Sequence, residues 1–340
     1  MNRKSLILFS LIALAFAFWT TPNKALALTI TPIRYEISGN PGETLHEKMT
    51  VINESKKAQV YYVSFANFEA QGDSGSPAFV DAKDDIGTWI TTDQASMNLG
   101  AGEQKTVPFT IHIPENAEPG GHFGAIFWGT TGSGAPGEVT IGTKTGVLIL
   151  LSVNGDVKEA AGLVDFQTHN NKHFYKELPV GFQYRFSNQG GDRVKPTGNI
   201  VIRQIFGVLA KKVNANPYDG NVLPGTTRKF SPEWSKGDSV EIRDQFLARN
   251  EKYSFMREVK SEWHNFALGI FRAKLDLSYG NGGEQIKSKA TYFVVFPFEL
   301  MLIIIAVAFI VFLILRTLIR RYNRAIIRKA EQHFKRQSRV

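Results

Sequence analysis

Few residues in this 340-residue chain stand at spacings that support chemistry. His169 and His173 lie four positions apart, which on a helix would place both imidazoles on one face, where they could bind a metal ion. The intervening Asn170 and Asn171 favour a turn instead. Because the pattern assures no third ligand, two ordinary loop histidines are the simpler interpretation.

A second group of candidate ligands is acidic. Asp81, Asp84 and Asp85 could bind calcium weakly through their carboxylate oxygens, or could form a solvent-exposed acidic turn. The chain contains no cysteine and therefore no thiol nucleophile. It also lacks the Gly-x-Ser-x-Gly, Ser-x-x-Lys and His-Glu-x-x-His motifs. We therefore assign no catalytic residue, no metal site and no cofactor, and expect a protein that is not an enzyme.

Aromatic side chains offer a better candidate for binding. The predicted strand at residues 60–68 carries Tyr61 and Phe65 on one face, and Tyr62 and Phe68 on the other. Rings exposed on such a strand could bind glycans or peptides. The alternative is that both faces are buried at a sheet or domain contact.

Short strands are expected to position these residues. From Leu28 onward, segments of alternating polarity are separated by Gly, Pro, Asn and Asp turns, which is typical of β-sandwiches and barrels. In residues 105–113, Val107, Phe109 and Ile111 alternate with polar neighbours. Pro108 cannot donate to a β ladder, so this segment is predicted to be an edge strand or to carry a bulge.

The opening segment changes parity. Leu28 and Ile30 share one face, whereas Tyr35 and Ile37 take the opposite parity after Thr31-Pro32. A break that reverses the inward set predicts a first strand that bends and passes from one sheet to the other.

The predicted fold is mainly β, with two tandem immunoglobulin-like β-sandwich domains at residues 28–153 and 154–291. Asn154-Gly155-Asp156 marks the expected junction. Further strands are predicted at residues 49–52, 123–128, 147–153, 182–186, 200–206, 227–230, 253–256, 271–279 and 285–291.

An apolar segment lies near each end of the sequence. Residues 1–27 have a basic start, an apolar run and small residues at the end, so they predict a cleaved signal peptide, or alternatively a retained anchor. Residues 292–315 predict a transmembrane helix, because about 20 apolar residues cross the hydrocarbon core. Pro297 and Glu299 are expected near its outer end, where a carboxylate can still reach water or headgroups.

Residues 316–340 form a basic tail, which predicts a cytoplasmic C-terminus and an extracellular N-terminus for a single-pass cell-membrane protein. Leu318, Tyr322 and Ile326 share one helical face, so the tail is expected to be an amphipathic helix against the anionic inner leaflet, or else a partner-binding helix. Acidic and basic residues nearly balance between Leu28 and Phe298, although the net charge is +9. Nucleic-acid binding is therefore not expected.

Four segments of the first domain carry a family resemblance: Asn40-Pro-Gly-Glu-Thr44 leading into Val51-Ile-Asn53, Trp89-Ile90, Leu99-Gly-Ala-Gly-Glu103, and Pro119-Gly-Gly-His-Phe-Gly-Ala-Ile126. With the overall layout, residues 28–153 resemble the N-terminal domain of the WxL-interacting proteins. These are bacterial surface proteins with two immunoglobulin-like domains, a transmembrane helix and a basic tail. The resemblance implies peptidoglycan binding by the first domain.

The second domain departs from that family, with Asn188-Gln-Gly-Gly191 and Leu223-Pro-Gly225 among its marked stretches. The resemblance therefore implies no role for it.

Three functions remain after these considerations. The first is a non-catalytic surface protein that binds peptidoglycan, a surface protein partner, or both. The second is a chaperone-like assembly factor that adds a β-strand to its clients. The third, a cell-wall hydrolase, would need two carboxylates facing each other across a cleft, which spacing in sequence cannot show.

Overall fold

The computed structural model describes residues 28–130, 143–236, 254–280 and 282–337, with side chains as far as Arg328. The predicted signal peptide at residues 1–27 lies outside this range. The described chain divides into two compact units. Unit 1 extends to Ala160 and includes the short segments Asn188–Arg193 and Leu223–Thr226. Unit 2 contains Ala161–Ser187, Val194–Val222 and the chain from Thr227 onward. The division falls at Ala160, whereas the turn residues place the junction at Asn154.

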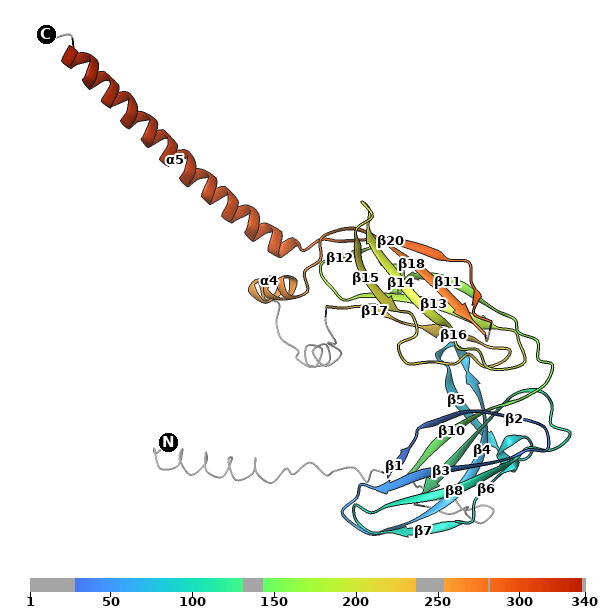
Figure 1. Cartoon of the computed structure of the whole chain (residues 1–340). Helices are drawn as coiled ribbons and strands as arrows, with labels where there is room; N and C mark the ends of the chain where they lie inside the picture. Colours follow the sequence, from blue (N-terminus) through green and yellow to red (C-terminus); the bar gives the residue numbers. More distant parts are fainter. Residues whose placement is uncertain (1–27, 131–142, 237–253, 281, 338–340) are drawn as a thin grey trace, which may run out of the picture. The chain divides into compact units, whose positions relative to one another are not determined.

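Unit 1 is built from strands and one short helix (Figure 1). Its elements are β1 (Leu28–Thr31), β2 (Arg34–Gly39), β3 (Thr44–Asn53), β4 (Gln59–Gln71), η1 (Gly72–Ser74), β5 (Ser76–Asp81), α2 (Ile86–Trp89), β6 (Ile90–Thr91), β7 (Ser96–Leu99), β8 (Gln104–His112), β9 (Gly120–Gly129) and β10 (Lys144–Val153). A four-stranded sheet has the order β1-β3-β8-β6, and a six-stranded sheet has the order β2-β10-β9-β4-β5 with β7 also on β4. Residues from both sheets, including Phe109, Trp128 and Ile149, form one buried core.

The bent first strand is confirmed. β1 pairs with β3 in one sheet, and β2 pairs in parallel with β10 in the other. The bend at Thr31-Pro32 moves Tyr35 and Ile37 across, so they pack on the same core as Ile30 despite their opposite parity. This exchange lets a single chain segment close both sheets at one side.

Strand β8 shows the predicted alternation, since Val107, Phe109 and Ile111 are buried. One side of β8 pairs with β3 along its length, without a register shift at Pro108. In the described ranges, its other side pairs with β6 only at Thr110 and Ile111. Pro108 therefore lies where no ladder donor is required, which agrees with the edge alternative of the prediction.

Unit 2 is a second sandwich. Its strands and helices are β11 (Ala161–Thr168), η2 (His169–Asn171), β12 (Phe174–Tyr175), β13 (Val180–Asn188), β14 (Thr197–Gln204), β15 (Leu209–Asn214), β16 (Thr227–Phe230), β17 (Glu233–Trp234), α4 (Phe255–His264), β18 (Gly269–Tyr279), β19 (Glu284–Gln285), β20 (Lys289–Val295) and α5 (Phe298–Gln337). One sheet has the order β11-β13-β16 with β17 on β13, and the other has the order β12-β20-β18-β14-β15 with β19 on β18. The fold is thus mainly β with immunoglobulin-like sandwiches, as predicted.

The core of unit 2 is rich in aromatic rings. Phe271, Ala273, Leu275, Leu277 and Tyr279 all point inward from β18, as their alternation predicts. The Phe271 and Phe293 rings stack with centroids 5.6 Å apart. Large aromatic side chains pack between the two sheets and hold them together without a disulfide.

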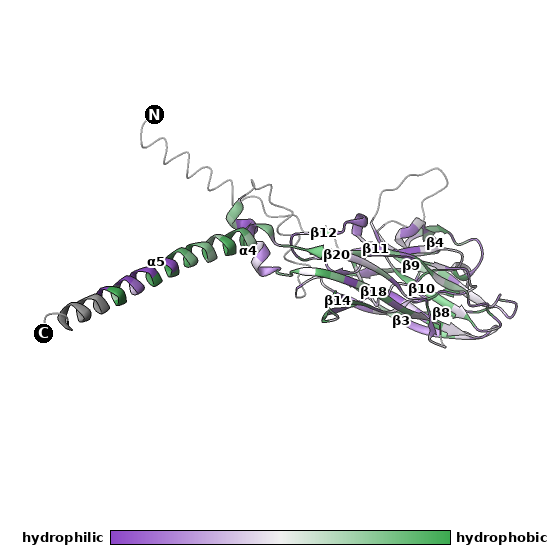
Figure 2. Cartoon of the chain, turned by 90° about the horizontal axis from the view of Figure 1, so that it is seen from above, coloured by the Kyte–Doolittle hydropathy of each residue, from purple (hydrophilic) through white to green (hydrophobic). Residues whose placement is uncertain are grey.

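Three expectations for the C-terminal region are wrong. Residues 255 and 256 begin the helix α4 rather than a strand. One side of this helix packs against α5, and that tertiary contact favours the helix over a strand. Strand β20 continues to Val295, so α5 begins at Phe298 instead of residue 292. The basic tail does not form a separate helix, since α5 runs unbroken to Gln337. Figure 2 shows its apolar first part and more polar later part.

Candidate functional site

The residues considered as possible metal ligands do not converge. His169 lies in the η2 turn, where Asn170 and Asn171 adopt positive φ, so the turn interpretation is confirmed. His173 instead directs Nδ1 to the Tyr292 carbonyl oxygen at 2.8 Å. Within the described ranges, no three His, Asp or Glu side chains are grouped to hold a metal ion, and this includes the acidic turn at residues 81–85.

The four candidate aromatic residues on β4 have separate environments. Tyr61 is buried and donates its hydroxyl to Asn53 Oδ1 at 2.9 Å, while Phe65 packs partly against the same core. Phe68 is buried on the opposite face of the sheet, and Tyr62 on that face is 40% exposed. They therefore do not form one exposed surface. Ligand binding by these residues stays a prediction, with Tyr62 as its most accessible member.

Phe68 belongs to an outer aromatic cluster, made of Phe68, Phe79, Phe123 and Phe127. Their centroids lie 4.8–6.0 Å apart along β5, β4 and β9. Leu150 packs against Phe68 from β10, but Phe79 remains 46% exposed. The cluster has apolar area without convergent polar groups, so it offers less specificity than the polar site described next.

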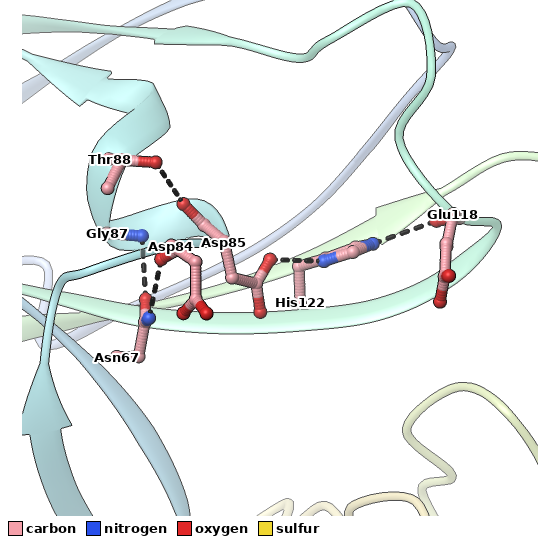
Figure 3. Close-up of polar contacts among 7 residues, drawn as sticks. All are labelled: Asn67, Asp84, Asp85, Gly87, Thr88, Glu118 and His122. Atoms are coloured by element: carbon pink, nitrogen blue, oxygen red, sulfur yellow. Dashed lines mark hydrogen bonds and ion pairs between the residues drawn. The ribbon is translucent and has the colours of Figure 1, made fainter.

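The polar site lies where the short helix α2 meets β9, and we call it the α2–β9 corner: Asp84, Asp85, Trp89, Glu118 and His122. Figure 3 shows these residues except Trp89. Asn67 on β4 binds the N-terminal end of this helix through two hydrogen bonds. Its amide donates to the Asp84 carbonyl at 2.7 Å, and its Oδ1 accepts from the Gly87 N–H at 2.7 Å. A Cβ at Gly87 would stand 2.7 Å from that Oδ1, so only glycine permits this approach.

Asp85 holds the corner together. Its backbone has a φ of 58°, in a region that residues other than glycine rarely adopt. Its carbonyl accepts from the Thr88 N–H at 2.9 Å and from the Thr88 hydroxyl at 2.7 Å. Its carboxylate oxygen lies 2.5 Å from His122 Nδ1. These bonds fix an unfavourable backbone conformation that directs the carboxylate at the histidine.

His122 is fixed through both ring nitrogens. Nε2 donates to the Glu118 carbonyl oxygen at 2.8 Å, and Nδ1 donates to Asp85 (Figure 3). Burial lowers the pKa of His122, but the Asp85 and Glu118 hydrogen bonds and negative charges outweigh it and raise the pKa above its ordinary value. With both nitrogens donating, the imidazolium form is favoured and has no lone pair with which to act as a general base.

Trp89 completes the corner. Its ring lies 4.7 Å from the His122 ring, between centroids, at an interplanar angle of 48°. An indole next to an imidazolium gains a cation–π attraction, which stabilises the ring position. Trp89 is half-buried against the core, while Asp84 and Thr88 of the same corner are exposed. The corner therefore presents an aromatic ring, carboxylates and a hydroxyl in one place, which suits binding of a polar ligand better than proton transfer.

Sequence reasoning named parts of this corner without joining them. Asp85 was a possible calcium ligand, whereas Trp89 and His122 carried only the family resemblance. The ion pair joins residues 37 positions apart, and no local period relates them. The sequence offered one weak signal: His122 is the only charged or strongly polar side chain in the glycine-rich segment that forms β9.

Comparison with known proteins is informative about likeness only. No family model and no curated protein matches the chain. Among solved structures, the class 5 fimbriae chaperone CfaA is similar at 14% identity, with 79% of this chain and 99% of that chain covered and a TM-score of 0.35. The Escherichia coli chaperone DraB shows 10% identity, coverage of 79% and 97%, and a TM-score of 0.33.

A chaperone–tip adhesin complex, CsuC–CsuE of Acinetobacter baumannii, is similar at 12% identity, with 60% of this chain and 89% of that chain covered and a TM-score of 0.32. The function of this chain must therefore be inferred from its own residues.

Proposed function

We propose that the chain is a non-catalytic, membrane-anchored surface protein that displays two immunoglobulin-like sandwiches and binds cell-wall glycan through the first. Anchoring is supported by one observation above all. Residues 298–328 of α5 are long and apolar enough to cross a membrane, and this helix leaves the second sandwich two residues after β20 ends.

The orientation follows from charge. Arg316, Arg320 and Arg321 begin a basic stretch at the far end of the apolar segment, which supports a cytoplasmic position for that end and an outer position for the sandwiches. Glu299, at the near end, was expected to face water or lipid headgroups, but its side chain is mostly buried. It forms an ion pair with Lys176 of the second sandwich at 2.6 Å, which joins the anchor to the domain.

The α2–β9 corner supports the choice of ligand. Sugar rings stack on aromatic faces through their C–H groups, and their hydroxyls need nearby donors and acceptors. Trp89 supplies the ring, whereas Asp84 and Thr88 of the same corner supply exposed polar groups. The resemblance to peptidoglycan-binding domains agrees with this assignment.

Co-sedimentation with purified cell walls tests the proposal. Full-length protein in detergent is expected to sediment with the walls, and Trp89→Phe or Asp84→Ala is expected to weaken the association several-fold. Trp263→Phe, in unit 2, is the matched control and should bind like the parent protein. Equal retention of all four proteins would reject the corner as the site, and absence of sedimentation would reject wall binding altogether.

A second candidate, chaperone-like strand addition, is favoured by β15. In the part of the chain that the structure describes, this strand pairs with β14 alone and its residues are mostly exposed. Lys211 and Lys212 lie on the strand, however, and lysine on an edge discourages pairing with other chains. Affinity capture from cell-envelope extracts tests this role: a stable client complex that is lost on β15 substitution Val213→Pro would favour it over glycan binding.

A further inference from the structure

The junction between the second sandwich and α5 is short and well bonded. Only Phe296 and Pro297 separate β20 from the helix. The Phe296 N–H donates to the Tyr175 carbonyl at 2.9 Å, and the Met301 N–H donates to the Pro297 carbonyl at 3.0 Å. The start of α5 is therefore held at one end of the sheet. If the chain is anchored as proposed above, the outer bilayer surface lies at this end.

The β14–β15 hairpin turns at the same end. On β18, Gly269 is paired with Val295 of β20, and Phe271 is paired with Gln204 of β14. The next bond along the sheet runs from the Ile205 N–H to the Ile270 carbonyl at 3.0 Å. Because paired residues of neighbouring strands lie at the same height, the hairpin tip stands beside the exit of α5.

This tip is apolar and projects into solvent. Its four apolar residues, Ile205, Phe206, Val208 and Leu209, are all exposed, and Phe206 is 90% exposed. The tip is also ordered, since the Gln204 N–H donates to the Val208 carbonyl at 2.8 Å and Gly207 turns with a φ of 86°. A rigid hairpin with four apolar residues at its apex is costly in water and indicates a surface that is covered in use.

Helix α4 provides a second apolar surface at this end, beside the start of α5 (Figure 1). Met256 and Trp263 are seven residues apart, so they share a helix face, and each is 66% exposed. The neighbouring, buried face carries Glu262, whose side-chain oxygen accepts the Leu300 N–H of α5 at 2.7 Å. The exposed face of α4 therefore has a fixed position next to the membrane helix.

We infer that the hairpin tip and the exposed face of α4 lie in the headgroup region of the outer leaflet, so that the second sandwich contacts lipid at two points besides α5. This inference rests on the proposed anchoring. We choose lipid as the occupant because both surfaces lie at the end of the sandwich where the apolar helix α5 begins. Arg203, Lys211 and Lys212 flank the hairpin tip, and aromatic rings with basic neighbours are the composition of membrane interfaces.

The absence of cysteine from the chain makes site-specific labelling direct. Phe206→Cys would carry an environment-sensitive fluorophore on the tip. Tyr218→Cys is the matched control, because Tyr218 is 81% exposed but lies beyond β15, at the end where Gly198 pairs with Leu277. Both full-length variants would be reconstituted into vesicles of phosphatidylcholine and phosphatidylglycerol.

The label at position 206 is expected to be shielded several-fold from aqueous iodide and quenched by brominated lipid, while the label at 218 remains accessible to iodide. Equal accessibility of the two labels, in protein that resists alkaline extraction from the vesicles, would overturn the inference and leave anchoring intact. Extraction of the protein by alkali would reject anchoring and the lipid contacts together. Shielding that requires an added protein extract would assign the tip to a protein partner and overturn the lipid contact.

Helix α4 has its own readout. Brominated lipid is expected to quench part of the tryptophan fluorescence in the parent protein, and Trp263→Phe is expected to remove that quenching. Trp128 and Trp234 are buried, which limits their contribution. Quenching that persists unchanged in Trp263→Phe would overturn the placement of α4 in the headgroup region.

Discussion

The carboxyl group of Glu262 caps helix α5, accepting the Leu300 N–H at 2.7 Å and the Glu299 N–H at 3.4 Å. The first turn of any helix leaves its amide groups without partners, and here a side chain from a different helix satisfies two of them. Glu262 is 1% exposed, so this capping takes place away from water. The arrangement joins α4 to α5 and fixes how the second sandwich meets α5.

Removing this cap should loosen α4. Glu262→Ala leaves the Leu300 N–H buried without an acceptor, which is expected to weaken docking of α4 by about 1–3 kcal/mol. Glu262→Gln keeps an oxygen acceptor and should cost less. Hydrogen exchange of the α4 amides at fixed pH measures the effect. Equal protection in the alanine variant and the parent protein would contradict the capping role.

The same contact should depend on pH. Burial and the neighbouring Glu299 carboxyl raise the pKa of Glu262 to about 7. Because the folded-state pKa is raised, the contribution of Glu262 to docking is full below its ordinary pKa and is lost as pH rises through about 7. A spin label at Met256→Cys should therefore become more mobile between pH 5 and pH 8. Adding Glu262→Gln should remove this dependence, and persistence of it would point to another group.

The first sandwich should show a pH dependence of its own. The pKa of His122 is raised in the folded state, so the stabilisation from its contact with Asp85 is full below about 6.5, the ordinary histidine value, and is lost as pH rises through the raised pKa. The unfolding free energy should fall over that interval in denaturant titrations of the full chain. Asp85→Asn should flatten the profile, because it removes the negative partner. An unchanged slope would contradict the proposed ion pair.

A buried polar network in unit 1 predicts two unequal mutations. Asn53 donates to the carbonyl oxygens of Lys57, Leu99 and Gly100, and accepts from Ser55 and Tyr61. Tyr61→Phe removes one hydrogen bond and should destabilise by about 1 kcal/mol, whereas Asn53→Leu strands several buried groups and should cost on the order of 3 kcal/mol or more.

Thermal and chemical unfolding of the two variants would measure this difference. Equal losses of stability in Tyr61→Phe and Asn53→Leu would show that Asn53 is not the centre of the network. The network also explains why Tyr61, a binding candidate by sequence, belongs to the core.

Sequence patterns predicted the elements wherever the pattern was long. The strict alternation from Phe271 to Tyr279 identified β18 and its inward face, and the parity change after Thr31 identified the bend between β1 and β2. The four-residue segment at 253–256 was too short to distinguish a strand from a helix. The spacing of Met256, Lys260 and Trp263 carried the helical signal, but it extends beyond that segment.

Local chemistry along the chain was enough to determine the β-rich class, the long apolar C-terminal helix and the position of many core residues, because period and segment length act between near neighbours. Only the tertiary structure decided that Asp85 meets His122 and that Glu262 meets Leu300. Strand register and packing bring those residues together across 37 and 38 positions, and no local pattern encodes such a meeting. The candidate ligand site and the coupling of the second sandwich to α5 both depend on these distant pairs.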